Sequence, residues 1–258
     1  MSNFNFLKNY QRLQYGIIFD EITNLSFALV GYCKIDKSSF WNFALINKPL
    51  LEEEILKIEK KFKSLRRNPV IYFENRENLK SLHNFLKEKG YQKDFEDSWM
   101  FWQGKEIDVS HFTSVKKVIT KEGLKVFLKT FSNCYQEGDP QNAYGELGDY
   151  LKVAKEVWHK HHKTNRIEYF LIYKGKNPVA VSTLTNHAGM GYISNMGSLK
   201  NVRGEGYGKI ATLYCIEQSK KNGNNIHYLA TEEGTYANKF YKRIGFNTLF
   251  TAVAYIKK

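Results

Sequence analysis

The sequence contains few cysteines and few prolines. Three cysteines (Cys33, Cys134 and Cys215) and four prolines occur in 258 residues. The cysteines are odd in number, scattered and without a C-x-x-C spacing, which argues against a disulfide framework or a cysteine zinc site. The scarcity of proline, and the absence of stretches dominated by Gly, Ser, Gln or Pro, argue against a long disordered segment.

Long apolar runs are also absent. Residues 1–6 do not combine a basic segment with an apolar one, so they do not match a secretory signal peptide. The most apolar runs, such as residues 169–173, are far shorter than the roughly 20 residues that cross a bilayer. Together with thiols suited to a reducing compartment, these features predict a cytoplasmic protein without a membrane partner.

Positive charge is in excess, because 39 Lys and Arg against 26 Asp and Glu give a formal net charge of +13. Such an excess attracts nucleic acid, an anionic membrane surface or an acidic ligand. The lysines are spread along the whole chain, however, and many stand beside glutamates on predicted helix faces, as in residues 52–63. This distribution favours a solvated surface over a nucleic-acid partner, and it is compatible with a phosphate-rich cofactor.

The second half of the chain alternates between strand and helix patterns. Short apolar runs bounded by turn residues predict strands, and apolar residues at helical spacing predict helices. The predicted strands are 115–120, 167–173, 178–185, 191–198, 226–231 and 246–256, and the predicted helices are 122–135, 146–160, 206–221 and 236–244. The fold class is therefore α/β.

The first half repeats the end of this pattern. Strands are predicted at 40–46, 70–74 and 98–102, and helices at 52–65 and 79–89. Both halves close with a helix, a glycine, an aromatic residue and a strand. That ending is a common way to terminate a helix, but the matching spacing of the preceding strands favours duplication of one unit. The predicted domains are residues 1–107 and 108–258.

One glycine-rich segment, residues 196–209, lies between a predicted strand and a predicted helix and reads MGSLKNVRGEGYGK. Gly204, Gly206 and Gly208 permit a tight turn, and the unpaired amides and dipole at a helix start form an anion site suited to a pyrophosphate. Arg203 and Lys209 add positive charge there. The spacing matches neither the G-x-x-x-x-G-K-(S/T) phosphate loop nor the dinucleotide motif G-x-G-x-x-G.

Two motifs resemble the GNAT superfamily of acyl-CoA-dependent N-acyltransferases. Residues 203–208 match that family's (R/Q)-x-x-G-x-(G/A) motif, and residues 237–246 are similar to its A-x-x-L-Y-x-x-x-G-F signature. The resemblance covers about residues 114–258. It implies a mixed, mostly antiparallel sheet flanked by helices in each half, acetyl-CoA or another acyl-CoA as co-substrate, no metal, and direct acyl transfer to an acceptor amine of unspecified identity.

The resemblance also assigns residues to roles. Backbone groups of Met196, Gly197 and Ser198 would bind the pantetheine arm like an added strand. The pyrophosphate would lie against the turn formed by Arg203, Gly204, Glu205, Gly206, Tyr207, Gly208 and Lys209. Tyr241 takes the place of the usual general acid, and a phenol of pKa about 10 can protonate a leaving thiolate of pKa about 8.5. Gly234 replaces an Asn common in the family, which removes a cofactor-arm contact unless Asn238 or Lys239 supplies it.

A general base is expected, because an alkylammonium of pKa near 10.4 is almost fully protonated at neutral pH. Glu232, at the end of a predicted strand, is the first candidate, and Glu233, His187, His227 or ordered water are alternatives. Each has a structural interpretation as well: the glutamates suit a helix start and His227 a packed strand. The neighbouring histidines at positions 159, 161 and 162 suit a helix C-terminus better than a metal site.

The first half lacks the glycine turn. Residues 47–54 read NKPLLEEE, which places acidic side chains where a pyrophosphate would bind, and Leu86 corresponds to Tyr241. This half is interpreted as a degenerate copy that packs on the catalytic half and shapes the acceptor cleft. Two rival functions stay open: an aminoacyl-tRNA-dependent transferase of the same fold, and a non-catalytic module that binds CoA or a partner.

Overall fold

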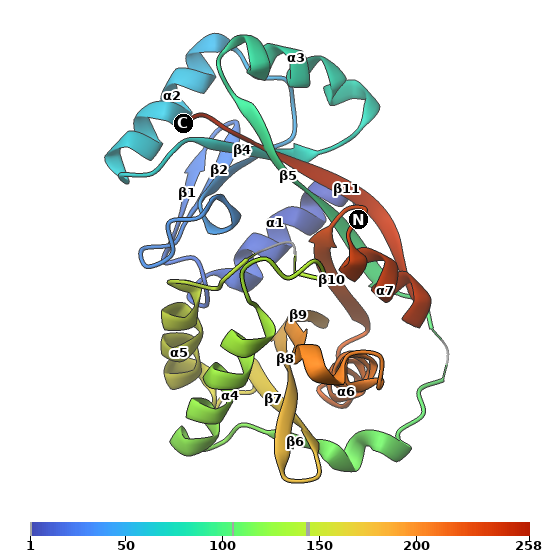
Figure 1. Cartoon of the computed structure of the whole chain (residues 1–258). Coiled ribbons are helices and arrows are strands. Elements are labelled where there is room, and N and C mark those ends of the chain that lie inside the picture. The colour runs from blue at the N-terminus through green and yellow to red at the C-terminus, as the bar shows by residue number, and fades with distance from the viewer. Residues whose placement is uncertain (1, 105, 143–144) are drawn as a thin grey trace. The chain divides into compact units, whose positions relative to one another are not determined.

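The computed structural model describes residues 2–104, 106–142 and 145–258 (Figure 1). Their contacts form two compact units. Unit 1 contains the chain up to Ser98 together with Phe250–Lys258, and unit 2 contains Trp99–Leu249. The structural division therefore falls before the predicted boundary after residue 107, and the last nine residues belong with the first unit. The proposed boundary between duplicated copies stays a prediction.

Unit 1 opens with a helix and a hairpin that the sequence patterns did not predict: α1 (Asn3–Gln14), β1 (Glu21–Leu25) and β2 (Ala28–Tyr32). It continues with β3 (Phe43–Ile46), α2 (Glu52–Ser64), β4 (Val70–Glu74), α3 (Lys80–Glu88) and β5 (Gln92–Trp102), which confirm the predicted elements. The last of these strands extends six residues further back than predicted.

The sheet of unit 1 has the order β1-β2-β3-β4-β11, where β11 (Phe246–Ile256) enters the unit at Phe250. Only β3 and β4 are parallel among these neighbours. A parallel pair needs a crossover, which α2 supplies. Residues from β2, β3, β4, β11, α2 and α3 bury a common apolar core that includes Ile58, Phe62 and Phe73.

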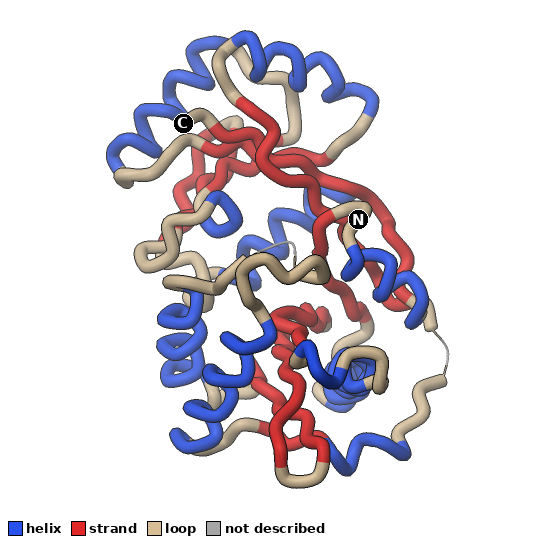
Figure 2. Tube along the Cα trace, in the orientation of Figure 1, coloured by secondary structure: helices blue, strands red, loops and turns tan. Residues whose placement is uncertain are grey.

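Unit 2 contains the remaining α-helices and strands, all of them predicted from the sequence. They are β6 (Val115–Lys117), α4 (Lys121–Cys134), α5 (Tyr150–His161), β7 (Ile167–Lys174), β8 (Asn177–His187), β9 (Met190–Ser198), α6 (Tyr207–Lys221), β10 (Ile226–Glu232) and α7 (Tyr236–Ile244). The strand order is β10-β9-β8-β7-β6. Neighbours are antiparallel except β9 and β10, which α6 connects. The mixed, mostly antiparallel fold is thus confirmed, and Figure 2 shows its strands in red and its helices in blue.

Helices cover both faces of this sheet, with α4 and α5 on one side and α6 on the other (Figure 1). Alternate residues of β7 show the two contacts. The Tyr169 ring stacks on Phe127 of α4 at a centroid distance of 4.4 Å, whereas Phe170 meets Tyr214 of α6 at 5.0 Å. Because both faces are covered, β7 is a nearly continuous apolar run and not an alternating one.

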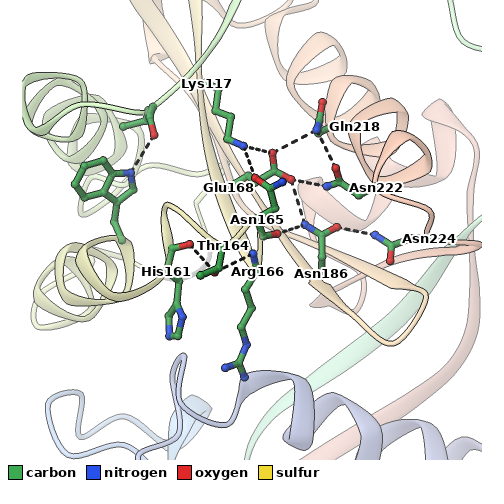
Figure 3. Close-up of polar contacts among 12 residues, drawn as sticks. Lys117, His161, Thr164, Asn165, Arg166, Glu168, Asn186, Gln218, Asn222 and Asn224 are labelled. Atoms are coloured by element: carbon green, nitrogen blue, oxygen red, sulfur yellow. Dashed lines mark hydrogen bonds and ion pairs between the residues drawn. The ribbon is translucent and has the colours of Figure 1, made fainter.

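A buried carboxylate fixes the C-terminal end of α6 (Figure 3). The Glu168 side chain is fully buried, and its Oε2 lies 2.7 Å from Lys117 Nζ. Gln218 Nε2 donates to the same oxygen at 3.3 Å, while Asn186 Nδ2 and Asn222 Nδ2 donate to Oε1. The four donors come from β6, β8 and the end of α6. The network therefore holds α6 against the sheet, and with it the position of the opposite, N-terminal end of the helix.

His227 of β10 lies near the same end of the sheet and is 8% exposed. Its Nδ1 lies 2.9 Å from Ser219 Oγ of α6. Burial, helped by Lys220, lowers the pKa of His227. This environment fits the packed-strand interpretation of the residue.

The depressed pKa of His227 makes stability depend on pH. The folded state holds the imidazole neutral, so its contribution is complete above the unfolded pKa of about 6.5 and is lost as the pH falls through the folded pKa. We expect a His227→Asn variant to lose less of its melting temperature than wild type between pH 7 and pH 5. Thermal denaturation measures this, with exposed His187→Asn as the control. Equal slopes in all three proteins would contradict the assignment.

Candidate acyl-CoA site

The parallel strands β9 and β10 separate before they end. Their register runs over three residue pairs, from Met190–Ile226 to Tyr192–Tyr228. Within the described part of the chain the register does not extend to residues 193–198 or 229–232. Peptide groups on a strand that leaves its neighbour need other partners. Residues 193–198 of β9, called the open stretch below, can therefore accept an extended polar chain, as in β-augmentation.

A β-bulge reshapes the same part of β9. Between the pairs Ser194–Thr183 and Gly197–Val181, β9 has one residue more than β8. Asn195 adopts a φ of 52° there, a conformation that Asn tolerates better than most residues. Its side chain accepts a hydrogen bond from Tyr150 Oη at 3.0 Å and donates one to Thr183 Oγ1 at 3.1 Å. A bulge re-aims the groups that follow it, here Met196, Gly197 and Ser198.

These three residues, predicted to bind pantetheine, lie at the end of β9. Tyr135 Oη donates to the Met196 carbonyl at 2.9 Å, and Arg203 Nε donates to the Ser198 carbonyl at 3.3 Å. Each carbonyl oxygen has a second lone pair for a further donor. Position 197 requires glycine because β9 lies close to Cys134 there, and a Cβ at this position would lie 2.6 Å from the Cβ of Cys134.

The turn from β9 to α6 places two glycines in the left-handed region. Gly204 has a φ of 87°, and Gly206, the residue that caps the N-terminus of α6, has a φ of 91°. Gly208 serves another purpose: a Cβ there would lie 3.3 Å from Ser198 Oγ and 3.5 Å from the Phe240 ring. Glycine at position 208 therefore lets the start of α6 approach both the end of β9 and α7.

The amides of this turn divide into two groups. Those of Arg203 and Glu205 donate to carbonyls of Lys200 and Val202 within the turn itself, at 3.4 and 3.3 Å. Those from Gly206 to Lys209 open α6, where helix geometry offers no acceptor one turn earlier and the helix dipole adds partial positive charge. The helix start, more than the turn before it, is suited to hold a diphosphate.

The charged side chains of the turn are mostly paired. Arg203 forms a two-pronged ion pair with Asp139, with distances of 2.8 Å from Nη1 to Oδ1 and 2.6 Å from Nη2 to Oδ2. The pair lowers the pKa of the Asp139 carboxyl and raises the pKa of Arg203. Glu205 Oε2 lies 2.7 Å from Lys174 Nζ. Lys209 is exposed in the first turn of α6.

The proposed acid, Tyr241, lies in α7 and is 7% exposed. Its ring packs against Phe240 and Phe246 at centroid distances of 5.2 and 5.7 Å. It shares an apolar cluster with Met196, which follows the bulge. The helix thus places the tyrosine beside the same part of β9 that the pantetheine arm is predicted to reach.

The candidate bases occupy different places. Glu232 ends β10 beyond its ladder with β9, and its carbonyl accepts from Thr235 Oγ1 at 2.8 Å. Glu233 Oε2 accepts from Asn238 Nδ2 at 3.3 Å, as in the helix-start interpretation. His187 pairs with Met190 at the opposite end of β9 from Ser198, and His227 pairs with Gly191 near that end. Both histidines therefore lie away from the open stretch, and Glu232 stays the first candidate.

The remaining predicted positions are the two candidates for the cofactor-arm contact and the histidines at the end of α5. Asn238 is 1% exposed and contacts Met100 Sδ at 3.6 Å, so it faces the core and does not replace the Asn missing at Gly234. Lys239 is exposed. His162 stacks on Trp158 at 3.9 Å. In residues 2–104, 106–142 and 145–258, no three or more His, Cys, Asp or Glu side chains are arranged to hold a metal ion.

The cysteines are unsuited to nucleophilic catalysis. All three are buried, and burial raises the pKa of Cys134 and of Cys215 to about 12. A thiol with such a pKa carries little reactive thiolate at neutral pH. Among the described helices, none is both long enough and apolar enough to span a bilayer.

Unit 1 lacks a comparable anion site at the start of α2. The Glu54 carboxylate accepts from the Leu51 amide at 2.9 Å, and its other oxygen lies 2.7 Å from Lys48 Nζ. The helix start is therefore occupied by a side chain of the helix itself, as in a capping box. Leu86, the counterpart of Tyr241, is fully buried. These contacts support the interpretation of unit 1 as a degenerate copy.

The mixed sheet, its separated parallel pair, the bulged strand and the helix opened by glycines together match a GNAT-like fold. Residues 125–246 match the model of the Acetyltransferase (GNAT) family. No curated protein matches the sequence.

Solved structures share the fold at low sequence identity. A conserved protein of unknown function from Staphylococcus epidermidis matches with a TM-score of 0.66 and 14% identity, over 93% of this chain and 94% of that one. A GCN5-related N-acetyltransferase from Kribbella flavida matches with a TM-score of 0.65 and 17% identity, over 96% of this chain and 94% of that one. A GCN5-related N-acetyltransferase from Sphaerobacter thermophilus matches with a TM-score of 0.56 and 13% identity, over 77% of this chain and 63% of that one. The shared fold extends beyond the matched domain into the first half of the chain.

Proposed function

We propose that unit 2 transfers an acetyl or other acyl group from acyl-CoA to an acceptor amine. The observation that supports this most directly is the separation of β9 from β10 after Tyr192 and Tyr228, next to the amides that open α6. The open strand suits the amide-containing pantetheine arm, and the helix start suits the diphosphate. The left-handed Gly204 and Gly206 and the close approach at Gly208 fit that assignment.

The proposed reaction is direct. The neutral amine attacks the thioester carbonyl carbon, a C–N bond forms and the C–S bond breaks. The nitrogen gives its proton to Glu232 or to water, and the leaving thiolate takes a proton from Tyr241. With all cysteines buried, no covalent enzyme intermediate is part of the proposal. Buried thiols also suit the reducing cytoplasm in which we place the protein.

Calorimetry with CoA, followed by thiol release from acetyl-CoA and longer acyl-CoAs against an amine panel, tests the proposal. We expect CoA binding and amine-dependent release of thiol. Binding without turnover would favour a non-catalytic CoA-binding module. No binding would overturn the proposal. An aminoacyl-tRNA donor is less favoured, because the glycine turn and helix start suited to CoA are intact.

Gly206→Ala is expected to weaken CoA binding about tenfold. An alanine at a φ of 91° costs about 1–2 kcal/mol, and relaxation toward negative φ re-aims the first amides of α6; about 1.4 kcal/mol corresponds to a tenfold change in Kd. Gly175→Ala, at a φ of 60° in the turn between β7 and β8, provides a control with similar strain away from the site. Calorimetry should show near wild-type CoA affinity for that control. Equal loss in both variants would mean that the effect is general destabilisation.

A further inference from the structure

The segment that follows α4 contacts β9 and its turn through polar groups. Tyr135 donates to the Met196 carbonyl, Asp139 pairs with Arg203, and Tyr150, which begins α5, donates to Asn195. All three contacts reach the stretch 195–203. The proposed function assigns that stretch to the acyl-CoA.

Asp139 is held in a defined turn. Its Oδ1 accepts from the Gln141 amide at 3.0 Å, and its own carbonyl accepts from the Asn142 amide at 2.9 Å. Asn142 Nδ2 donates in turn to the Gln136 carbonyl at 3.2 Å. The side chain of Asp139 is 6% exposed, against 18% for Arg203. Asp139 is thus a preorganised partner for the guanidinium and not a mobile surface acid.

The donors of Arg203 are largely committed. Nη1 and Nη2 each bind one oxygen of Asp139, and Nε binds the Ser198 carbonyl. A paired guanidinium has its charge balanced, so a diphosphate there would either break a shielded two-pronged pair or bring further negative charge close to Asp139. The amides from Gly206 to Lys209 have no such competitor at the helix start.

We propose that Arg203 is a positioning residue and that Asp139 is its functional partner. The pair connects the turn after α4 to the end of β9 and fixes the Ser198 peptide, while the start of α6 binds the diphosphate. This inference rests on the proposed function for its effect on CoA. The pantetheine arm, followed back from the helix start along Ser198 to Asn195, ends beside the bulge. The turn held by Asp139 lies along the same stretch, so the pair also orders a part of the chain that flanks the reacting thioester.

Two opposite expectations separate this role from phosphate binding. If Arg203 positions the turn, Asp139→Asn and Arg203→Gln weaken CoA binding in the same direction, and the double variant is no weaker than the stronger single one. If Arg203 binds phosphate directly, Asp139→Asn frees it and tightens CoA binding, whereas Arg203→Gln weakens it. Calorimetry with CoA on all four proteins decides, and opposite signs overturn the proposal.

Hydrogen exchange without ligand tests the connection even if CoA does not bind. We expect amides of residues 135–142 to exchange about tenfold faster in each single variant, because local opening becomes about 1.4 kcal/mol easier. Arg203→Lys keeps the charge but not the fork, so it should resemble Arg203→Gln. Glu205→Gln, which breaks an exposed pair in the same turn, should leave this segment unchanged. Wild-type exchange in Asp139→Asn and Arg203→Lys would overturn the proposal, and melting curves confirm that each variant is folded.

Discussion

A Tyr241→Phe variant is expected to lose at least about tenfold in kcat while it keeps its affinity for CoA, since general acids contribute about 10²–10⁴-fold. The phenyl ring can keep the packing against Phe240 and Phe246. The change therefore removes the phenolic proton donor and keeps the aromatic ring. Steady-state acyl transfer at saturating acceptor, together with calorimetry for CoA, measures the two properties separately.

A tyrosine on the same helix supplies the control for this variant. Tyr236 begins α7 and is 45% exposed, so Tyr236→Phe deletes a hydroxyl from the same helix at its solvent-exposed start. We expect its kcat to stay at the wild-type value. If Tyr241→Phe also turns over at the wild-type rate, the thiolate leaves without help from this phenol. The acid assignment is then wrong, even if the acyltransferase proposal stands.

The elements of unit 2 could be predicted because the order of apolar and polar residues along the sequence matches the way these elements are buried. Strands such as β7 and β8 contain short apolar runs, and the helices have apolar residues at helical spacing, bounded by turn residues such as Asn222 and Gly223. The glycine turn was visible for a related reason. Positive φ at Gly204 and Gly206 favours glycine at those positions. The backbone conformation of the turn could therefore be inferred from the glycines in the sequence.

The helix at the start of unit 1 was not predicted because it buries two glutamine side chains. Gln11 and Gln14 are each 1% exposed on the inner face of α1, beside Tyr10 and Leu13. Polar residues on a buried face interrupt the periodic pattern of apolar residues from which a helix is predicted. The five-residue strands β1 and β2 that follow are too short and too mixed to stand out on their own.

The contacts that shape the site could not be predicted for a different reason. Asp139 and Arg203 are 64 positions apart, and no local pattern links a loop aspartate to a distant arginine. The bulge at Asn195 depends on the register of β9 against β8, which a single strand sequence does not specify. The residues proposed to bind through the backbone could therefore be named from the sequence, whereas the side chains that hold that backbone could not, namely Tyr135, Asp139, Tyr150 and Asn195.

The two units differ at the helix start that we propose binds a diphosphate in unit 2. In each, a helix connects a parallel pair of strands: β3 and β4 through α2, and β9 and β10 through α6. The first turn of α2 contains Glu52, Glu53 and Glu54, and the last of these binds the Leu51 amide. A carboxylate at a helix start stabilises the helix through the same dipole that would attract a phosphate. In α2 the Glu54 carboxylate therefore occupies the place that a bound anion would take.

Glu168→Ala is expected to lower the free energy of unfolding of unit 2 by about 3–5 kcal/mol, because it removes a fully buried carboxylate and leaves three amide donors without an acceptor, at about 1–3 kcal/mol for each unsatisfied buried group. Lys117, Asn186, Gln218 and Asn222 all donate to this fully buried carboxylate. Urea denaturation measures the change. Glu156→Ala, which removes an exposed pair with Lys160, should cost less than about 1 kcal/mol.

A double variant distinguishes a network from a simple ion pair at this position. Replacing a buried ion pair by apolar residues of similar size is often neutral, so Lys117→Met with Glu168→Met should recover stability if the pair acted alone. Here three amide donors would still lose their acceptor, and an unsatisfied buried donor costs about 1–3 kcal/mol. We therefore expect the double variant to remain destabilised. Recovery to wild-type stability would show that the amides find other partners and that the end of α6 is held by packing alone.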